Sequence, residues 1–306
     1  MKSNFQIPIF VGLIVVCFAA NSVITRYLVL AQQVSPFLVT VIRFVSGFLM
    51  LLVLTRIEPT FFRPSKPDKS YLVAAFFLGA YAFSISYGYL FISVGAGTFI
   101  FYTFVVVTMG TYSVILEKER FTLRLVLGEL LGLLGVLVIT FGGISAVKLP
   151  GVLLMAATGA FWGLYSVYGR RFQIAFSYTY NSFLVFGAFA ILASIALGFT
   201  GALNSVSISL PNLGLALYLG MVSTALSYVL WNETLKKVSA SLGGLVQLAV
   251  PLIAPAMGII LLGEQLTLTL VVGGGLVLGG IYLAGSARRR PTSSAGKGKE
   301  LSPPDP

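Results

Sequence analysis

The sequence predicts an all-α polytopic membrane protein in which ten transmembrane helices form two inverted five-helix repeats around a central cavity. Its composition gives the first reason, because 57% of the 306 residues are hydrophobic and 9% are charged. Soluble globular proteins carry roughly 25% charged residues. Too few charges are present to cover a surface that faces water, so lipid must solvate most of the exterior.

An internal repeat gives the second reason. Four pairs of landmark residues are separated by the same 145 positions: Glu119 and Glu264, Thr122 and Thr267, Gly128 and Gly273, and Gly135 and Gly280. In each copy a long apolar run is followed by a short Glu-x-x-Thr link and then by an apolar run punctuated by glycines. A two-fold repeat in a hydrophobic chain is typical of transporters built from two homologous halves.

Ten apolar runs are long enough to cross a bilayer, which takes roughly 20 residues. They lack the alternation of period two that marks membrane barrels, so we predict helices. The first run is too long for a cleaved signal peptide, and we expect it to be retained as a helix. The ten predicted helices cover residues 6–29, 36–57, 71–92, 95–116, 123–144, 150–170, 180–200, 211–232, 239–262 and 267–286.

Basic residues are concentrated in alternate links between these runs and in the C-terminal tail, whereas the opposite links carry almost only Lys148. By the positive-inside rule, both termini face the cytoplasm of a multi-pass protein in the cell (inner or plasma) membrane. Because each repeat has five helices, the second is inverted relative to the first. We expect repeats over residues 1–144 and 145–287, and a disordered basic cytoplasmic tail over residues 288–306.

Polar and aromatic side chains occur near the middle of several predicted spans, where lipid penalises them unless they face protein or a wet cavity. As a set they predict a substrate-binding cavity, although for any single residue a hydrogen bond between helices is an equal alternative. Tyr102 and Gln247 are repeat mates, which places polar groups at matching depths in both halves. The candidate substrate-binding residues of this set are Tyr81, Ser84, Tyr102, Trp162, Tyr165, Ser227, Tyr228 and Gln247.

Arg43 is a further candidate, because it lies about eight residues into the second predicted span. A lone charge at a helix centre costs roughly 2.5–3.5 kcal/mol on insertion scales. No acid lies at helical spacing to pair with it. We predict either an anchor for a carboxylate or phosphate of the substrate, or a side chain that snorkels to the outer interface.

Pro251 and Pro255 lie inside the ninth predicted span. An interior proline removes one backbone hydrogen bond and bends its helix. We predict a hinge at this pair, with a static kink as an equal alternative. The first repeat has Val106 and Gly110 at the matching positions, so the two halves are not mechanically equivalent.

The two Glu-x-x-Thr links sit at the water boundary, which favours a structural interpretation over a coupling acid. Glu119 and Glu264 are expected to lie near the positive end of a helix. Thr122 and Thr267 are expected to cap the helices that follow them.

Glycines spaced by four in the fifth and tenth spans predict close packing of helix backbones in lipid. The pairs are Gly128 with Gly132 and Gly275 with Gly279. We expect these two helices to act as scaffold.

Several classes of function are disfavoured by what the sequence lacks. It has no histidine and one cysteine, Cys17, so cysteine or imidazole metal sites and His-based acid–base chemistry are absent. No carboxylate lies near the middle of a span and no G-x-x-x-x-G-K-[ST] motif is present, so we expect no metal, no cofactor, no enzymatic activity and no ATP hydrolysis. The net charge of +11 follows the membrane topology and does not indicate a nucleic-acid partner.

Three segments carry a resemblance to a known family. Residues Ala249–Leu283 read AVPLIAPAMGIILLGEQLTLTLVVGGGLVLGGIYL, residues from Ala160 to Arg171 read AFWGLYSVYGRR, and FAANSVITRY follows more loosely from Phe18. With the ten-span layout, they resemble the EamA-type members of the drug/metabolite transporter superfamily, in the ten-helix branch that includes amino-acid exporters.

The resemblance implies a basket of ten helices around a path for the substrate. The third, fourth, eighth and ninth helices would line this path with help from the first, second, sixth and seventh, and the fifth and tenth would brace it. Members export amino acids and related metabolites, or move drugs and sugar phosphates.

We therefore predict a secondary transporter that exports small metabolites, amino acids first among them, by alternating access through the central cavity. The alternatives within the superfamily are carriers of organic phosphates, nucleotide sugars or drugs. Outside it, the alternatives are a non-transporting membrane scaffold and an intramembrane enzyme. The expected partners are a small-molecule substrate and the lipid bilayer, with the chain working as a monomer or as a dimer.

Overall fold

The computed structural model describes residues 3–60, 62–116, 122–141, 147–200, 207–237, 247 and 249–286. Within these ranges all regular secondary structure is helical. Eight helices are long and apolar enough to span a membrane, and two shorter apolar helices accompany them. The predicted fold class, an all-α polytopic membrane protein built from two inverted repeats, is confirmed.

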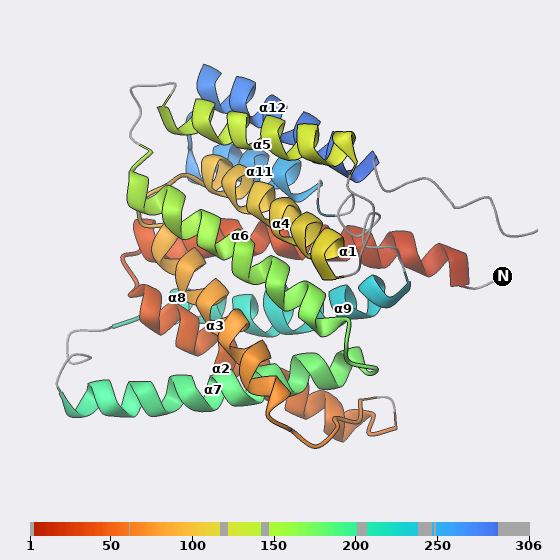
Figure 1. Cartoon of the computed structure of the whole chain (residues 1–306). Coiled ribbons are helices and arrows are strands. Elements are labelled where there is room, and N and C mark those ends of the chain that lie inside the picture. Colours follow the sequence, from red (N-terminus) through yellow and green to blue (C-terminus); the bar gives the residue numbers. More distant parts are fainter. Residues whose placement is uncertain are drawn as a thin grey trace, which may run out of the picture.

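The helices follow one another as two sets of five spans (Figure 1). The first set contains α1 (Ser3–Arg26) continuing into the π-helix η1 (Tyr27–Ala31), α2 (Pro36–Ile57), α3 (Ser70–Gly88), α4 (Val94–Leu116) and α5 (Leu123–Phe141). The second set contains α6 (Leu149–Gly169), α7 (Ala175–Phe199), the continuous span α8 (Leu210–Gly220), η2 (Met221–Leu226) and α9 (Ser227–Lys237), then α11 (Val250–Leu262) and α12 (Leu268–Ser286).

Prolines and one glycine mark where several helices begin and end. The helices α2, α6, α8 and α11 each carry a proline in the first turn, where its missing N–H has no intrahelical partner to lose. At the end of α11, Gly263 has a φ of 66°. Glycine adopts this left-handed conformation without a steric cost, so it stops the helix there.

Three predicted boundaries differ from the structure by four or five residues. The eighth span ends at Lys237 rather than 232. The helix α3 ends at Gly88 rather than 92, and the Arg26 side chain binds the carbonyl of Tyr89 just beyond that end. The helix α7 begins at Ala175 rather than 180, because its first two turns carry polar residues that are buried in protein. A hydropathy count omits such residues, since it assumes that a span faces lipid.

Some sequence predictions lie outside the described residues. These are the start of the ninth span, the tail over residues 288–306, and the position of Glu119.

The helices α5 and α12 touch backbone to backbone through the four glycines of the internal repeat. A Cβ on Gly128 would lie 2.5 Å from the Gly280 carbonyl oxygen, and one on Gly135 would lie 2.5 Å from that of Gly273. Each contact is the other's image under the repeat, because Gly128 corresponds to Gly273 and Gly135 to Gly280. The contact between α5 and α12 is therefore two-fold symmetric, in agreement with the internal repeat.

We predicted that Gly275 and Gly279 make the close helix contact on the tenth span, and this contact corrects that prediction. Gly275 has nothing within 4 Å of its Cβ position, and Gly279 meets a side-chain atom at 3.6 Å. Gly273 and Gly280 make the close approach instead, because their spacing of seven returns them to the face that meets α5.

The α5–α12 pair forms one edge of the bundle and α7 lies at the opposite edge (Figure 1). Between these edges run α1, α3, α4, α6 and α9 (Figure 1). The largest fully buried side chains include Trp162 of α6, Trp231 of α9 and Arg43 of α2. Exposed leucines cover the outer face of α5. An apolar exterior around a polar and aromatic centre is the arrangement that lipid as a solvent requires.

Candidate substrate-binding site

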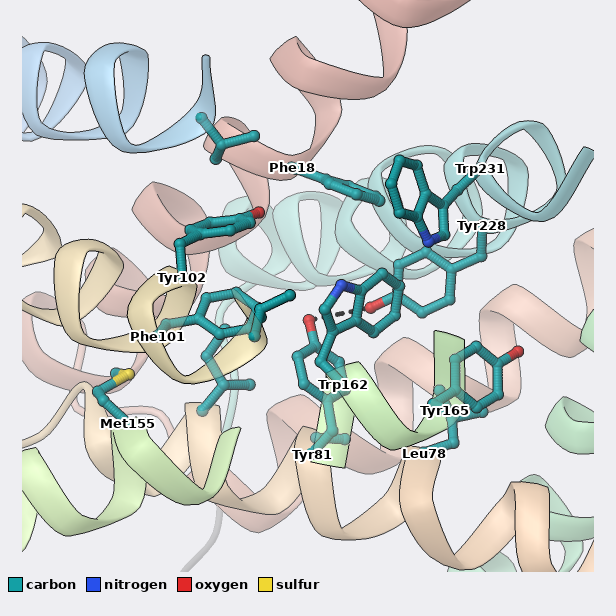
Figure 2. Packing of buried hydrophobic residues seen from close by; sticks show 14 of the residues in the cluster. Phe18, Leu78, Tyr81, Phe101, Tyr102, Met155, Trp162, Tyr165, Tyr228 and Trp231 are labelled. Carbon is teal, nitrogen blue, oxygen red and sulfur yellow. Dashed lines mark hydrogen bonds between the residues drawn. The ribbon is translucent and has the colours of Figure 1, made fainter. Parts of the chain in front are cut away.

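The candidate site is built around Trp162 of α6, which is 2% exposed. Its ring centroid lies 4.6 Å from that of Tyr228 on α9, 5.1 Å from that of Tyr81 on α3, and 5.5 Å from that of Phe18 on α1. Figure 2 shows these rings turned toward one another. Helices from both halves thus contribute to one aromatic cluster, and such rings present faces on which a planar or cationic group can rest.

A small cavity lies inside this cluster. It encloses about 10 Å³, which is about the room for one water molecule. Its lining residues are Phe18, Asn21, Ser22, Tyr81, Ile85, Phe101, Tyr102, Trp162 and Tyr228. A metabolite larger than water does not fit into this volume, so its binding needs movement of the residues that line the cavity.

Arg43 of α2 is fully buried behind Tyr81 and Tyr228. Its Nε donates to Thr224 Oγ1 at 2.7 Å, and its Nη2 donates to the hydroxyls of Tyr81 at 3.1 Å and Tyr228 at 2.9 Å. The guanidinium also lies 5.4 Å from the centroid of the Tyr81 ring. A side chain held by three hydroxyls at zero exposure does not snorkel to an interface.

The charge of Arg43 meets no carboxylate among the described residues. The ion pair that these residues form joins Arg26 to Glu264, elsewhere in the bundle. The Nη1 atom of Arg43 has no hydrogen-bond partner. Taking a charge out of water costs several kcal/mol unless an opposite charge or hydrogen bonds compensate it. The hydroxyls compensate part of this cost and leave a region of positive potential behind the aromatic cluster.

Thr224 links Arg43 to the first helix, a connection that sequence reasoning missed. Its Oγ1 also lies 3.5 Å from Asn21 Nδ2, while Asn21 Oδ1 is buried without a partner and belongs to a residue of the cavity wall. Thr224 lies in η2, and π-helical turns often occur at functional sites. Asn21 could have been selected from the sequence as a site residue, because it is a polar residue inside an apolar span.

The repeat mates Tyr102 and Gln247 are both buried but play different parts. Tyr102 belongs to the cavity wall. Gln247 does not, and its Oε1 accepts a hydrogen bond from Trp162 Nε1 at 3.2 Å. The amide therefore orients the central indole from behind.

Three other predicted site residues lie outside the cavity wall. Tyr165 is fully buried and stacks on Trp162 with centroids 5.7 Å apart. Ser227 donates to the carbonyls of Ser223 and Thr224, so it satisfies the backbone of its own helix. Ser84 is half-buried on α3.

The two prolines proposed as a hinge have different positions in α11. Pro251 lies in the first turn, where it breaks no hydrogen bond of that helix, and Pro255 lies in the interior. Sequence reasoning placed both in a helix interior. Only Pro255 has that position among the described residues.

At one end of the bundle, Glu264 joins helices of both halves. Its two carboxylate oxygens accept from the backbone N–H of Val94 at 2.8 and 2.9 Å, at the start of α4. Arg26 Nε lies 3.6 Å from Glu264 Oε1. Thus the acid meets a helix N-terminus, as expected, but that of α4 rather than of the helix that follows it. The pair borders a half-polar pocket of about 240 Å³.

The threonines of the two links act as helix caps. Thr122 Oγ1 accepts from Leu125 N at 3.3 Å, and Thr267 Oγ1 accepts from Leu270 N at 3.2 Å. The predicted capping is therefore confirmed for both repeats.

A polytopic helical protein with an internal inverted repeat and a polar cluster between the halves has the architecture of secondary transporters. The sequence profile described as the EamA-like transporter family matches residues 6–141 and again residues 149–286. The chain therefore belongs to the EamA-like transporter family, and it is a multi-pass membrane protein.

Several relatives share most of the chain. An uncharacterized protein of Pseudomonas aeruginosa is 35% identical over 271 residues, which cover 89% of this chain and 91% of the relative. An uncharacterized transporter of Clostridium kluyveri is 26% identical over 89% of this chain and 90% of its own length. A crystal structure of a protein 20% identical in sequence superposes with a TM-score of 0.68 over 94% of this chain and 99% of the other. This last likeness concerns the fold alone.

Proposed function

We propose that this transporter is a secondary carrier that exports small metabolites from the cell, with amino acids as the leading class, by alternating access through the Trp162 cluster. The observation that carries the proposal is the small cavity of about 10 Å³, which is lined by aromatic rings and polar groups from both halves. A site that closes around its substrate between two inverted repeats is what alternating access requires.

The orientation of the molecule in the membrane follows, in this proposal, from the placement of charges in the sequence. Basic links and a basic tail favour cytoplasmic termini in the cell membrane. In that orientation the end that carries Arg26 and Glu264 faces outward, and the link between α4 and α11–α12 closes the outer side. Release of substrate then needs those helix ends to separate.

The chemistry of the cluster favours amino acids over organic phosphates. Arg43 is the one basic side chain that contacts this cluster among the residues described, and it stands behind two tyrosines. A phosphate carries up to two negative charges and is commonly bound by several cationic or N–H donors. A carboxylate carries one negative charge, so it needs fewer donors than a phosphate, and the few donors at this site are enough to bind it.

A thermal-shift measurement on purified protein tests the proposal. Ligands that bind the native state raise its unfolding temperature, so we expect amino acids to raise it and nucleosides and sugar phosphates to leave it unchanged. The Trp162→Phe variant should lose most of the shift. Phe189→Ala, a change at a lipid-facing side chain that is 64% exposed, is the matched control and should keep it. A shift with sugar phosphates and none with amino acids would overturn the proposed class.

A further inference from the structure

We infer that the site recognises its substrate by two separate polar ends, a carboxylate at the Tyr81 hydroxyl, beside Tyr228, and an amine at Asn21. The inference rests on the proposed transport function and narrows its substrate class. The transported compound is an α-amino acid whose carboxylate and amine are both free, and Asn21 of α1 is an amine-binding residue.

The carboxylate end follows from counting lone pairs and protons on the two tyrosines. The Tyr81 hydroxyl oxygen accepts from Arg43 Nη2 at 3.1 Å and from the Tyr228 hydroxyl at 2.9 Å, which occupies both of its lone pairs. Its own proton has no acceptor among the described residues. Figure 2 shows the two hydroxyls meeting beside Trp162. The Tyr228 proton is used on Tyr81, and Tyr228 accepts from Arg43 Nη2, so one lone pair of Tyr228 stays free. The pair therefore keeps one proton, that of Tyr81, to donate to an anionic oxygen in the cavity.

Arg43 sets this polarity from behind the cavity wall. It is fully buried, lacks a described carboxylate, and touches both tyrosines through one nitrogen. It is a positioning residue, because the hydroxyls stand between it and the cavity. Its charge makes the potential at the hydroxyls positive, so an anionic oxygen is favoured there over a neutral one. Lysine has a single nitrogen and cannot reach Thr224 and both tyrosines with the same geometry.

The amine end lies next to the carboxylate end. Asn21 Oδ1 is a buried acceptor with no partner, on a residue of the cavity wall. Asn21 and Arg43 meet at the same atom, Thr224 Oγ1, at 3.5 and 2.7 Å. The Asn21 acceptor is thus joined through Thr224 and Arg43 to the Tyr81 donor, and both residues line one cavity, as an amine and a carboxylate belong to one α-amino acid. The rings of Trp162 and Tyr228 add faces that attract a cation.

Three compounds separate the two ends in proteoliposomes. Counterflow of radiolabelled L-phenylalanine is measured in the presence of one unlabelled competitor at a time. The competitors are phenylalanine itself, phenylalanine amide, which lacks the carboxylate, and 3-phenylpropionate, which lacks the amine. For the wild-type protein we expect each analogue to compete at least about tenfold less well than phenylalanine, since each leaves buried polar groups unpaired. The ratio between competitors within one variant does not depend on how much protein is folded.

Variants assign each end to its residues. Asn21→Leu should remove most of the preference for phenylalanine over 3-phenylpropionate, and Asn21→Asp, which keeps an acceptor, should retain it. Tyr81→Phe and Arg43→Lys should each reduce the preference for phenylalanine over its amide and leave the preference over 3-phenylpropionate intact. Phe189→Ala should match the wild type in both ratios.

The outcomes distinguish this inference from the proposed function. Phenylalanine flux in which the amide and 3-phenylpropionate compete equally well overturns the two-ended site and leaves amino-acid transport standing. Flux whose selectivity is unchanged in Asn21→Leu overturns the role of Asn21. If folded protein moves neither phenylalanine nor any other amino acid of a panel, the proposed function fails, and the two-ended site fails with it.

Discussion

At the scale of single residues, Arg43 ties α2 to α3, η2 and α9 inside the membrane-spanning bundle. Stability does not explain its burial, because taking a charge out of water with no opposite charge beside it costs several kcal/mol. A guanidinium kept at zero exposure without a described acid is better explained by the site that it polarises.

Replacing Arg43 by methionine therefore separates stability from transport. Met fills a similar volume without a charge, so we expect the unfolding temperature of Arg43→Met to stay the same or rise. Transport should fall at least about tenfold, because the tyrosine hydroxyls lose the charge that orients them. Fluorescence-monitored unfolding and flux at matched protein levels measure the two effects. A variant that loses stability and keeps its flux would assign Arg43 to packing.

Tyr102 is the second residue whose role can be measured directly. Its ring belongs to the cavity wall, whereas its repeat mate Gln247 stands behind Trp162. Loss of one hydrogen bond to a substrate costs about 0.5–1.5 kcal/mol, or about two- to twelvefold in affinity. We expect Tyr102→Phe to raise the half-saturation concentration by this factor while the folded protein stays intact. Titration of flux against substrate measures it, and an unchanged half-saturation would leave Tyr102 a packing residue.

At the scale of helices, α5 and α12 depend on the absence of side chains at four positions. A Cβ on Gly128 would lie within 2.5 Å of backbone atoms of both Gly280 and Ala284. Backbone cannot move aside as the tip of a side chain can, so the two helices would have to separate. Gly275, on α12 as well, faces open space.

These two glycines form a matched pair for an experiment. We expect Gly128→Ala to lower the unfolding temperature clearly, because overpacking costs typically about 1–3 kcal/mol. Gly275→Ala should leave it unchanged or raise it, since alanine favours a helix more than glycine does. Thermal unfolding of both variants in detergent is the measurement. Equal effects of the two substitutions would show that α5 and α12 do not meet through the Gly128 face.

At the scale of the whole molecule, the repeat and the apolar runs were sufficient to predict the architecture. Hydropathy is a local property, so the spans could be placed within a few residues. The shared offset of 145 positions identified Gly128, Gly135, Gly273 and Gly280, which then meet as two symmetric pairs. Only the pairing of faces needed the structure, which is why Gly275 and Gly279 were misplaced.

The site was less accessible from the sequence, because its contacts join distant residues. Arg43 meets Thr224 and Tyr228 across separations of 181 and 185 residues, and no spacing rule predicts such pairs. Single positions could be selected by their cost in lipid, as Tyr81, Trp162 and Arg43 were. Their division into cavity wall, positioning residue and packing depends on the crossing of helices.

The orientation of the molecule gives a prediction at the same scale. The basic bias in the sequence favours cytoplasmic termini. An alkaline phosphatase fusion after Arg290 should then be inactive, and one inserted near Ser205 should be active outside the cytoplasm. The reverse pattern of activity would contradict the orientation and would place the Arg26–Glu264 end on the cytoplasmic side.

The central claim is that amino acids cross the membrane through the Trp162 cluster without nucleotide hydrolysis. Uptake of radiolabelled amino acids into proteoliposomes, in the absence of ATP, tests it most directly. We expect saturable uptake with the wild-type protein and with Phe189→Ala, and uptake reduced at least about tenfold with Trp162→Ala, which removes the ring at the centre of the cluster. Uptake no faster than in protein-free liposomes, for wild-type protein shown to be folded, would contradict the account.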